Sequence, residues 1–231
     1  MLKQFFEIFR KDNLLQQAFD RSVEMLELDS RMFATAVESL RRRDDARLDM
    51  DVYAADQKIN HYEQEVRRKA MTHLALGQGA NLHGGMVLIS IVIDIERIGD
   101  YTKNIVDLAL RHPERLQCGP FEKRIGRVES TVMKAFARLI EALPVSDQEA
   151  AGEVMSEHWW ITRKTDDIVN RLIDGESGLE GPDAVVVALY SRFLKRISAH
   201  QMNIASSIVN PFDRIGFRDK STDAENADTQ V

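Results

Sequence analysis

Apolar side chains recur along this chain of 231 residues at intervals of three, four and seven positions, which places them on one face of an α-helix. In the first such segment the inward positions are Leu15, Phe19, Leu26, Phe33, Val37 and Leu40, and in the second they are Val52, Ile59, Val66 and Met71. We expect helices over about 13–43, 47–76, 81–110, 121–143, 147–173 and 182–210, with the prolines between them or at their starts. The sequence therefore predicts an all-α fold of six long helices, antiparallel to their neighbours because the connections are short.

Two apolar runs could also be interpreted as β-strands. They are VLISIVI, residues 87–93, and AVVVALY, residues 184–190, and both are rich in β-branched side chains. Each run continues into an amphipathic segment that is too long for a strand. Apolar character on all sides is typical of a helix at the centre of a bundle, so we interpret both runs as helical.

The segment DIERIGDYTKNIVD, residues 94–107, has a weaker echo in LKRISAHQMNIASS, residues 194–207. Alignment of Arg97 with Arg196 pairs isoleucines and asparagines at an offset of 99 residues, nearly half the chain. This offset predicts two tandem three-helix bundles, repeat one over 13–115 and repeat two over 116–212. An amphipathic segment, 1–12, precedes them, and a polar tail that we expect to be disordered, 213–231, follows them.

Composition narrows the function classes. Net charge is −6 and the acidic and basic residues are interleaved, which argues against nucleic acid as a partner. The single cysteine, Cys118, rules out an intrachain disulfide and fits a reducing compartment. The chain has neither a run of 18 apolar residues nor the apolar core of a signal peptide. We therefore expect a cytoplasmic protein.

Acidic residues form matching rows on the second and third predicted helices. Glu96 and Asp100 are one turn apart on one face, and Asp56, Asn60 and Glu63 share a face at spacings of four and three. If the two helices pack antiparallel, their carboxylate and amide oxygens converge, and such ligands suit hard cations. The alternative is that both rows are solvated helix faces.

Motifs typical of enzymes are missing from the sequence. It contains no G-x-x-x-x-G-K-[ST] loop and no H-E-x-x-H, and none of the six histidines follows a glutamate by three positions. We therefore expect a protein that is not an enzyme. A metalloenzyme built on the carboxylate cluster remains the alternative from another class.

The motif ERIGD with NI four residues later, after a helix carrying D-x-x-x-N-x-x-E, resembles the PhoU family over about residues 14–210. The resemblance implies that repeat one binds a hard metal ion or cluster of iron, manganese, magnesium or calcium, through Asp56, Asn60, Glu63, Glu96 and Asp100. Repeat two departs from the family pattern, because Lys195 and Ala199 stand at the positions of Glu96 and Asp100. Its other row is expected at His158, Thr162 and Asp166, and we predict no metal there.

The resemblance also implies a function and its partners. It implies a regulator of inorganic phosphate uptake that acts as an adaptor on a phosphate transporter, a sensor histidine kinase or both, and a homodimer is compatible with the family. An accessory subunit of a single-component or sodium-coupled phosphate permease is the alternative. In the N-terminal segment Leu2, Phe5, Phe6 and Phe9 form an apolar face beside basic residues. This face could lie on a membrane, dock on a transporter, or pack on the chain's own bundle or a dimer mate.

Overall fold

The computed structural model describes residues 14–76, 81–112, 114–179 and 181–217. Within these ranges the chain forms six α-helices and no strand. Three come from the first half: α2 (Leu14–Arg42), α3 (Val52–Leu76) and α4 (Leu82–Arg111). Three come from the second half: α5 (Glu122–Val145), α6 (Gln148–Ile173) and α7 (Gly181–Val209), with short 3₁₀ turns at η1 (Gly119–Phe121) and η2 (Phe212–Arg214). The all-α prediction is confirmed, and both β-branched runs are helical.

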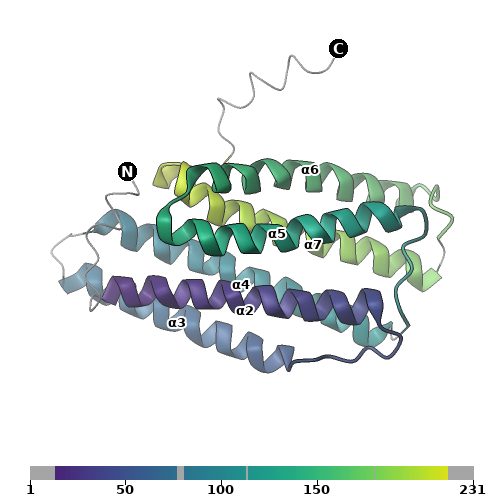
Figure 1. Ribbon diagram of the computed structural model, residues 1–231, viewed down its shortest axis with the longest axis horizontal. Coiled ribbons are helices and arrows are strands. Elements are labelled where there is room, and N and C mark those ends of the chain that lie inside the picture. Colours follow the sequence, from purple (N-terminus) through teal and green to yellow (C-terminus); the bar gives the residue numbers. More distant parts are fainter. Residues whose placement is uncertain (1–13, 77–80, 113, 180, 218–231) are drawn as a thin grey trace, which may run out of the picture.

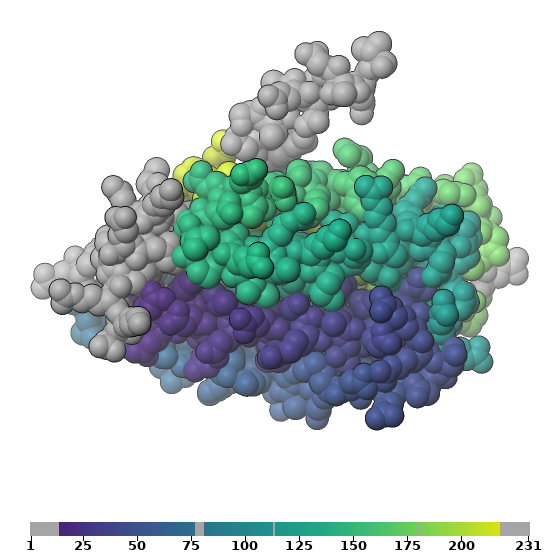
Figure 2. Space-filling view, viewed as in Figure 1, coloured from purple at the N-terminus to yellow at the C-terminus, as the bar shows by residue number. Residues whose placement is uncertain are grey.

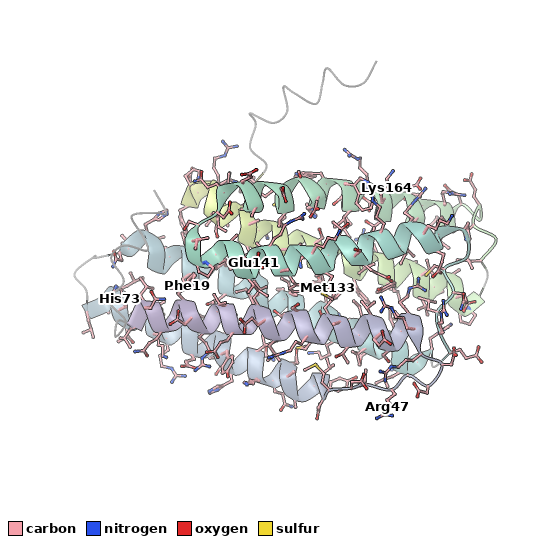
Figure 3. All side chains as sticks on the ribbon, viewed as in Figure 1. Phe19, Arg47, His73, Met133, Glu141 and Lys164 are labelled. Atoms are coloured by element: carbon pink, nitrogen blue, oxygen red, sulfur yellow. The ribbon has the colours of Figure 1, made fainter. Side chains whose placement is uncertain are left out.

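The six helices lie side by side as two groups of three (Figure 1). Within each group every helix contacts the other two, and the groups meet along α4 with α7 and along α2 with α5. Figure 2 shows the second half of the chain seated on the first along the face formed by α2 and α5. Figure 3 shows Met133 in the seam between these two helices, where its Sδ accepts a bond from Ser30 Oγ at 3.9 Å. One continuous apolar core therefore runs through both groups.

Local chemistry explains where several helices begin. Asp147 caps α6, since its side chain accepts bonds from the backbone N–H groups of Glu149 and Ala150. Asp51 accepts a bond from Ala54 N at 2.9 Å, so α3 starts at Val52 and not at the predicted position near 47. Pro182 stands in the first turn of α7, where its missing N–H costs nothing.

Two details of the sequence prediction are wrong. Met71 was expected to face inward, but it is 64% exposed, whereas the other predicted inward residues of α2 and α3 are buried. Pro144 lies inside the last turn of α5 and not beyond the helix end. Proline has no backbone N–H, so one hydrogen bond of the final turn is missing. The helix tolerates Pro144 because no further turn follows it. None of the helices in the described part of the chain is long and apolar enough to cross a bilayer.

A buried arginine ties the two groups of helices together. Arg41, at the end of α2, is 6% exposed and bonds Glu129 Oε1 through Nε at 2.8 Å and Glu122 Oε1 through Nη2 at 2.6 Å. It also donates to the carbonyl of Leu116, in the connection between the groups. Tyr190 of α7 donates its hydroxyl to the same Glu129 oxygen at 2.8 Å. Three helices and the connection thus share one buried polar network.

The predicted terminal segments lie largely outside the described residues. This applies to all of the N-terminal segment, 1–12, and to the tail beyond residue 217. The predicted division into repeats at 115 and 116 stays a prediction.

Candidate functional site

The predicted acidic rows of α3 and α4 do face each other, and a lysine joins them. Lys103 Nζ donates to Asp56 Oδ2 on α3 at 2.8 Å and to Asp100 Oδ1 on its own helix at 3.2 Å. The Asp56 side chain is only 10% exposed, and that of Lys103 is 26% exposed. Burial lowers the pKa of Lys103, but the bonds to the two aspartates outweigh burial and raise it overall. An ammonium group therefore lies between two of the predicted metal ligands.

The glutamates of the site are held by arginines on their own helices. Arg67 bonds Glu63 at 2.7 Å, and Arg97 lies 3.6 Å from Glu96 and 3.2 Å from Asp100. Burial raises the pKa of Glu96, as do the charges of Asp100, Glu63 and Asp56, while Arg97 opposes the shift. Asn60, the fifth predicted ligand, is half-buried on the same helix as Glu63. The site is thus strongly anionic and only partly neutralised.

A further carboxylate, from α2, lies near this site, and the sequence prediction missed it. Asp29 is 0% exposed, and neither of its oxygens has a hydrogen-bond partner among the described residues. Burial raises the pKa of its carboxyl well above the ordinary value, and so do the charges of Asp56 and Glu96. A sequence signal existed, because Asp29 falls between Leu26 and Phe33 on the apolar face of the first helix.

Glycine at position 99 brings Asp29 close to the seam between α3 and α4. A Cβ added to Gly99 would lie 3.0 Å from Asp29 Oδ1 and 3.3 Å from Ile59 Cδ1. The absence of a side chain at Gly99 thus permits the close approach of α2 and α3 to α4. The missing side chain leaves the Asp29 carboxylate next to the backbone of the ERIGD motif.

The donors suit a hard cation, although the side chains are not arranged around one. As they stand, no three Asp, Glu, His or Cys side chains of the described chain could hold one ion. Lys103 accounts for this, since it holds Asp56 and Asp100 around its own charge. Two features still fit a cation: the donors are oxygens only, and the buried Asp29 oxygens have no partner. Metal binding by Asp56, Asn60, Glu63, Glu96 and Asp100 stays a prediction.

The corresponding place in repeat two holds an ion pair and a buried histidine. Lys195 Nζ bonds both oxygens of Asp166 at 2.7 Å. His158 is 6% exposed, its Nδ1 lies 3.0 Å from Ser198 Oγ, and its Nε2 lies 3.4 Å from Thr162 Oγ1. Burial, with a contribution from Lys195, lowers the pKa of His158 to about 4. This seam is closed by hydrogen bonds and by the ion pairs of Asp166 with Lys195 and Arg192.

The structure also corrects the predicted register of the second row. Gly99 lies against Ile59, and at the offset of 99 residues their counterparts are Ser198 and His158, which also lie against each other. His158 therefore corresponds to Ile59, a core position, and not to the acidic position Asp56. The histidine occupies a core position, and both of its ring nitrogens lie within hydrogen-bond distance of a neighbouring hydroxyl group.

The two copies of the motif meet across α4 and α7. Asp94 Oδ1 lies 2.7 Å from His200 Nδ1 and accepts a bond from Asn203 Nδ2 at 2.8 Å. The ring of Tyr101 stacks on that of His200, and Arg196 Nε donates to the Tyr101 hydroxyl at 3.1 Å. Asn203 therefore has a structural role in this seam, and His200 packs between the two groups of helices.

Comparison with known proteins supports the same relationship as the motif. Residues 22–109, which include every candidate ligand, match the model of the PhoU domain. Two curated relatives, from Caulobacter vibrioides strains NA1000 / CB15N and ATCC 19089 / CIP 103742 / CB 15, are each 27% identical over 181 residues, 76% of this chain and 77% of theirs. Both are named "Phosphate-specific transport system accessory protein PhoU homolog".

Solved structures share the fold. A crystal structure of PhoU from Pseudomonas aeruginosa superposes with a TM-score of 0.74 at 22% identity, covering 85% of this chain and 95% of that one. A crystal structure of the phosphate transport system regulatory protein PhoU from Streptococcus pneumoniae superposes with a TM-score of 0.71 at 19% identity, covering 84% and 93%. The motif, the domain match and the fold agree: residues 22–109 match the PhoU domain, and the chain shares the fold of these two PhoU structures.

Proposed function

We propose that this chain is a non-enzymatic regulator of inorganic phosphate uptake that acts as an adaptor on a phosphate transport system. The observation that carries the proposal is the similarity to the Caulobacter relatives, which extends over three quarters of both chains. Those relatives are named as accessory proteins of a phosphate-specific transport system. The adaptor docks through its helical faces on a transporter subunit, a sensor histidine kinase or both, at the cytoplasmic side of the membrane. Surface recognition needs no catalytic group.

The carboxylate cluster gives little support to a metalloenzyme. Catalysis by a metal needs an open coordination position beside the ion. Lys103 pairs with Asp56 and Asp100, so two of the carboxylates that would hold a reactive ion are already neutralised. A structural or regulatory cation fits these residues better than a catalytic one.

We further propose that repeat one binds a hard cation, of iron, manganese, magnesium or calcium. Asp56, Asn60, Glu63, Glu96 and Asp100 would hold it. When bound, the ion would supply positive charge to a partly buried anionic seam. These residues would then draw α3 and α4 together and give the adaptor a more rigid docking face.

Metal analysis of purified protein tests the cation. Glu96→Ala with Asp100→Ala should abolish bound metal, because it removes the α4 donors. Asp166→Ala is the matched control, since it removes a carboxylate from repeat two, where Lys195 is its partner. Full metal retention by the double variant would refute the site.

Recovery of partners tests the adaptor. A tagged chain would be purified from membranes of cells grown at low and at high phosphate, and its companions identified. Components of an ATP-driven phosphate transporter or its histidine kinase are expected, with amounts that change with phosphate. A lone sodium-coupled permease would instead support the accessory-subunit alternative. Deletion of the gene without any change in phosphate uptake would contradict both.

A further inference from the structure

Asp29 is an anomaly that the fold does not require. A carboxylate taken out of water without a partner is strongly unfavourable, whether it stays charged or takes up a proton. Asp29 is fully buried, and neither oxygen has a partner in the part of the chain that the structure describes. In α5, the helix that holds the corresponding place in the second group, every buried residue is apolar. The architecture can thus be built without an acid at this place.

The position of Asp29 points it toward the acidic seam. Its carboxylate lies beside Gly99, where a Cβ would be only 3.0 Å from Oδ1. Gly99 stands between Glu96 and Asp100 in the motif. Asp29 also interacts electrostatically with Asp56 on α3 and Glu96 on α4. Carboxylates from three helices are therefore near enough to repel one another, and a cation between them would offset that repulsion.

We propose that Asp29 is an inner ligand of the repeat-one cation site, to which the absence of a side chain at Gly99 gives its carboxylate close approach. The inference rests on the proposed cation binding in repeat one. It adds a ligand from α2, a helix that carries none of the E-R-I-G-D or D-x-x-x-N-x-x-E residues. A bound ion would then connect all three helices of the group, because α2 also packs against both α3 and α4.

The proposal predicts opposite effects of one substitution on two measurements. Asp29→Asn keeps the shape of the side chain but removes its charge. Without metal, the variant should be more stable than the wild type at neutral pH, because the buried carboxyl must either stay charged or take up a proton on folding, and the amide does neither. With metal, it should bind Mn²⁺ at least about 10-fold more weakly, because a charged donor is lost. A residue with only a structural role would not weaken metal binding while it stabilises the metal-free protein.

The experiment uses the full chain, stripped of metal, with Mn²⁺ as the probe. Calorimetry and the electron paramagnetic resonance of free Mn²⁺ give the affinity, and urea unfolding gives the stability of the metal-free protein. Gly99→Ala is the second variant, since the added methyl would lie only 3.0 Å from Asp29 Oδ1 and would push the carboxylate away from α4. It should also weaken Mn²⁺ binding, although every carboxylate is retained.

The outcomes separate the two proposals. Wild-type affinity for Mn²⁺ in Asp29→Asn would overturn the assignment of Asp29 and leave the motif site intact. Weaker binding in Asp29→Asn with a rise in metal-free stability supports it. A wild-type chain that binds neither Mn²⁺ nor Fe³⁺ would overturn the cation site and, with it, the role of Asp29.

Discussion

Tyr101 of α4 stacks on His200 of α7, with ring centroids 5.7 Å apart and planes inclined by 23°. The two residues are separated by 99 positions, the offset that aligns the two copies of the motif. Equivalent positions of the two copies thus face each other across the seam between the two groups of helices. Asp94 and Asn203 extend this seam on one side of the stack, and Phe193 extends it on the other.

A double-mutant cycle should measure how strongly the two rings couple. Tyr101→Ala and His200→Ala should each lower the free energy of unfolding, and their effects should fall short of additivity by about 0.5–1.5 kcal/mol, the range for a ring pair. Urea unfolding of the two single variants and the double variant gives the coupling. Tyr53 of α3, whose hydroxyl donates to Asp107, serves as the uncoupled partner in a parallel cycle. Strict additivity for Tyr101 and His200 would contradict the stack.

Acid should destabilise the protein through His158. Its folded-state pKa of about 4 lies below the ordinary value of 6.5, so the native state favours the neutral ring. The protein is therefore most stable above pH 6.5, where the ring is neutral in both the folded and the unfolded state. As pH falls from about 6.5 to 4, the free energy of unfolding should drop by about 3 kcal/mol in total. Urea unfolding as a function of pH measures the loss.

The control for this prediction comes from the chain itself. His158→Ile installs the side chain found at the corresponding Ile59 of repeat one and should flatten the pH dependence between 6.5 and 4. His61→Ile, at an exposed position of α3, should leave the dependence unchanged. An unchanged slope in His158→Ile would show that other groups cause the acid sensitivity.

Removal of the buried arginine should be far more costly than removal of its neighbour. Arg41→Met leaves the largely buried Glu129 carboxylate with only Tyr190 as a partner and leaves the Leu116 carbonyl without its donor. We expect a loss of about 3 kcal/mol in the free energy of unfolding. Arg42→Met removes an exposed pair with Glu38 and should cost at most about 0.5 kcal/mol. Equal effects in urea unfolding would refute the network.

Lys103 should compete with a metal ion for the same oxygens. Lys103→Gln frees Asp56 and Asp100, so it should lower the stability of the metal-free protein by about 1 kcal/mol and tighten Mn²⁺ binding by about 10-fold. Lys195→Gln frees only Asp166 in repeat two and should leave Mn²⁺ affinity unchanged. Calorimetric titration of both variants distinguishes them, and weaker binding by Lys103→Gln would mean that the ammonium supports the metal site.

Much of the helical architecture could be predicted from the order of residues. Helical spacing places Leu26 and Phe33 on one face of α2, and it places Glu96 and Asp100 on one face of α4, before any tertiary contact forms. The helix ends were less accurate, because the start of α3 depends on a cap at Asp51 and on the irregular stretch before it. The exposure of Met71 also could not be predicted, since periodicity identifies a face but not how far the neighbouring helix covers it.

The pairing of charges was decided by the tertiary structure alone. Sequence spacing relates residues within one helix, whereas Asp29 feels the charges of Asp56 and Glu96 from a separate helix, and Lys103 reaches across from α4 to α3. Such contacts depend on the distance and rotation between packed helices. The sequence therefore identified the two acidic rows and the loss of acids in repeat two. Packing determined that a lysine lies between the rows and that a buried aspartate lies beneath them. The burial of a side chain and its partners depend on residues that are distant in the sequence but close in space.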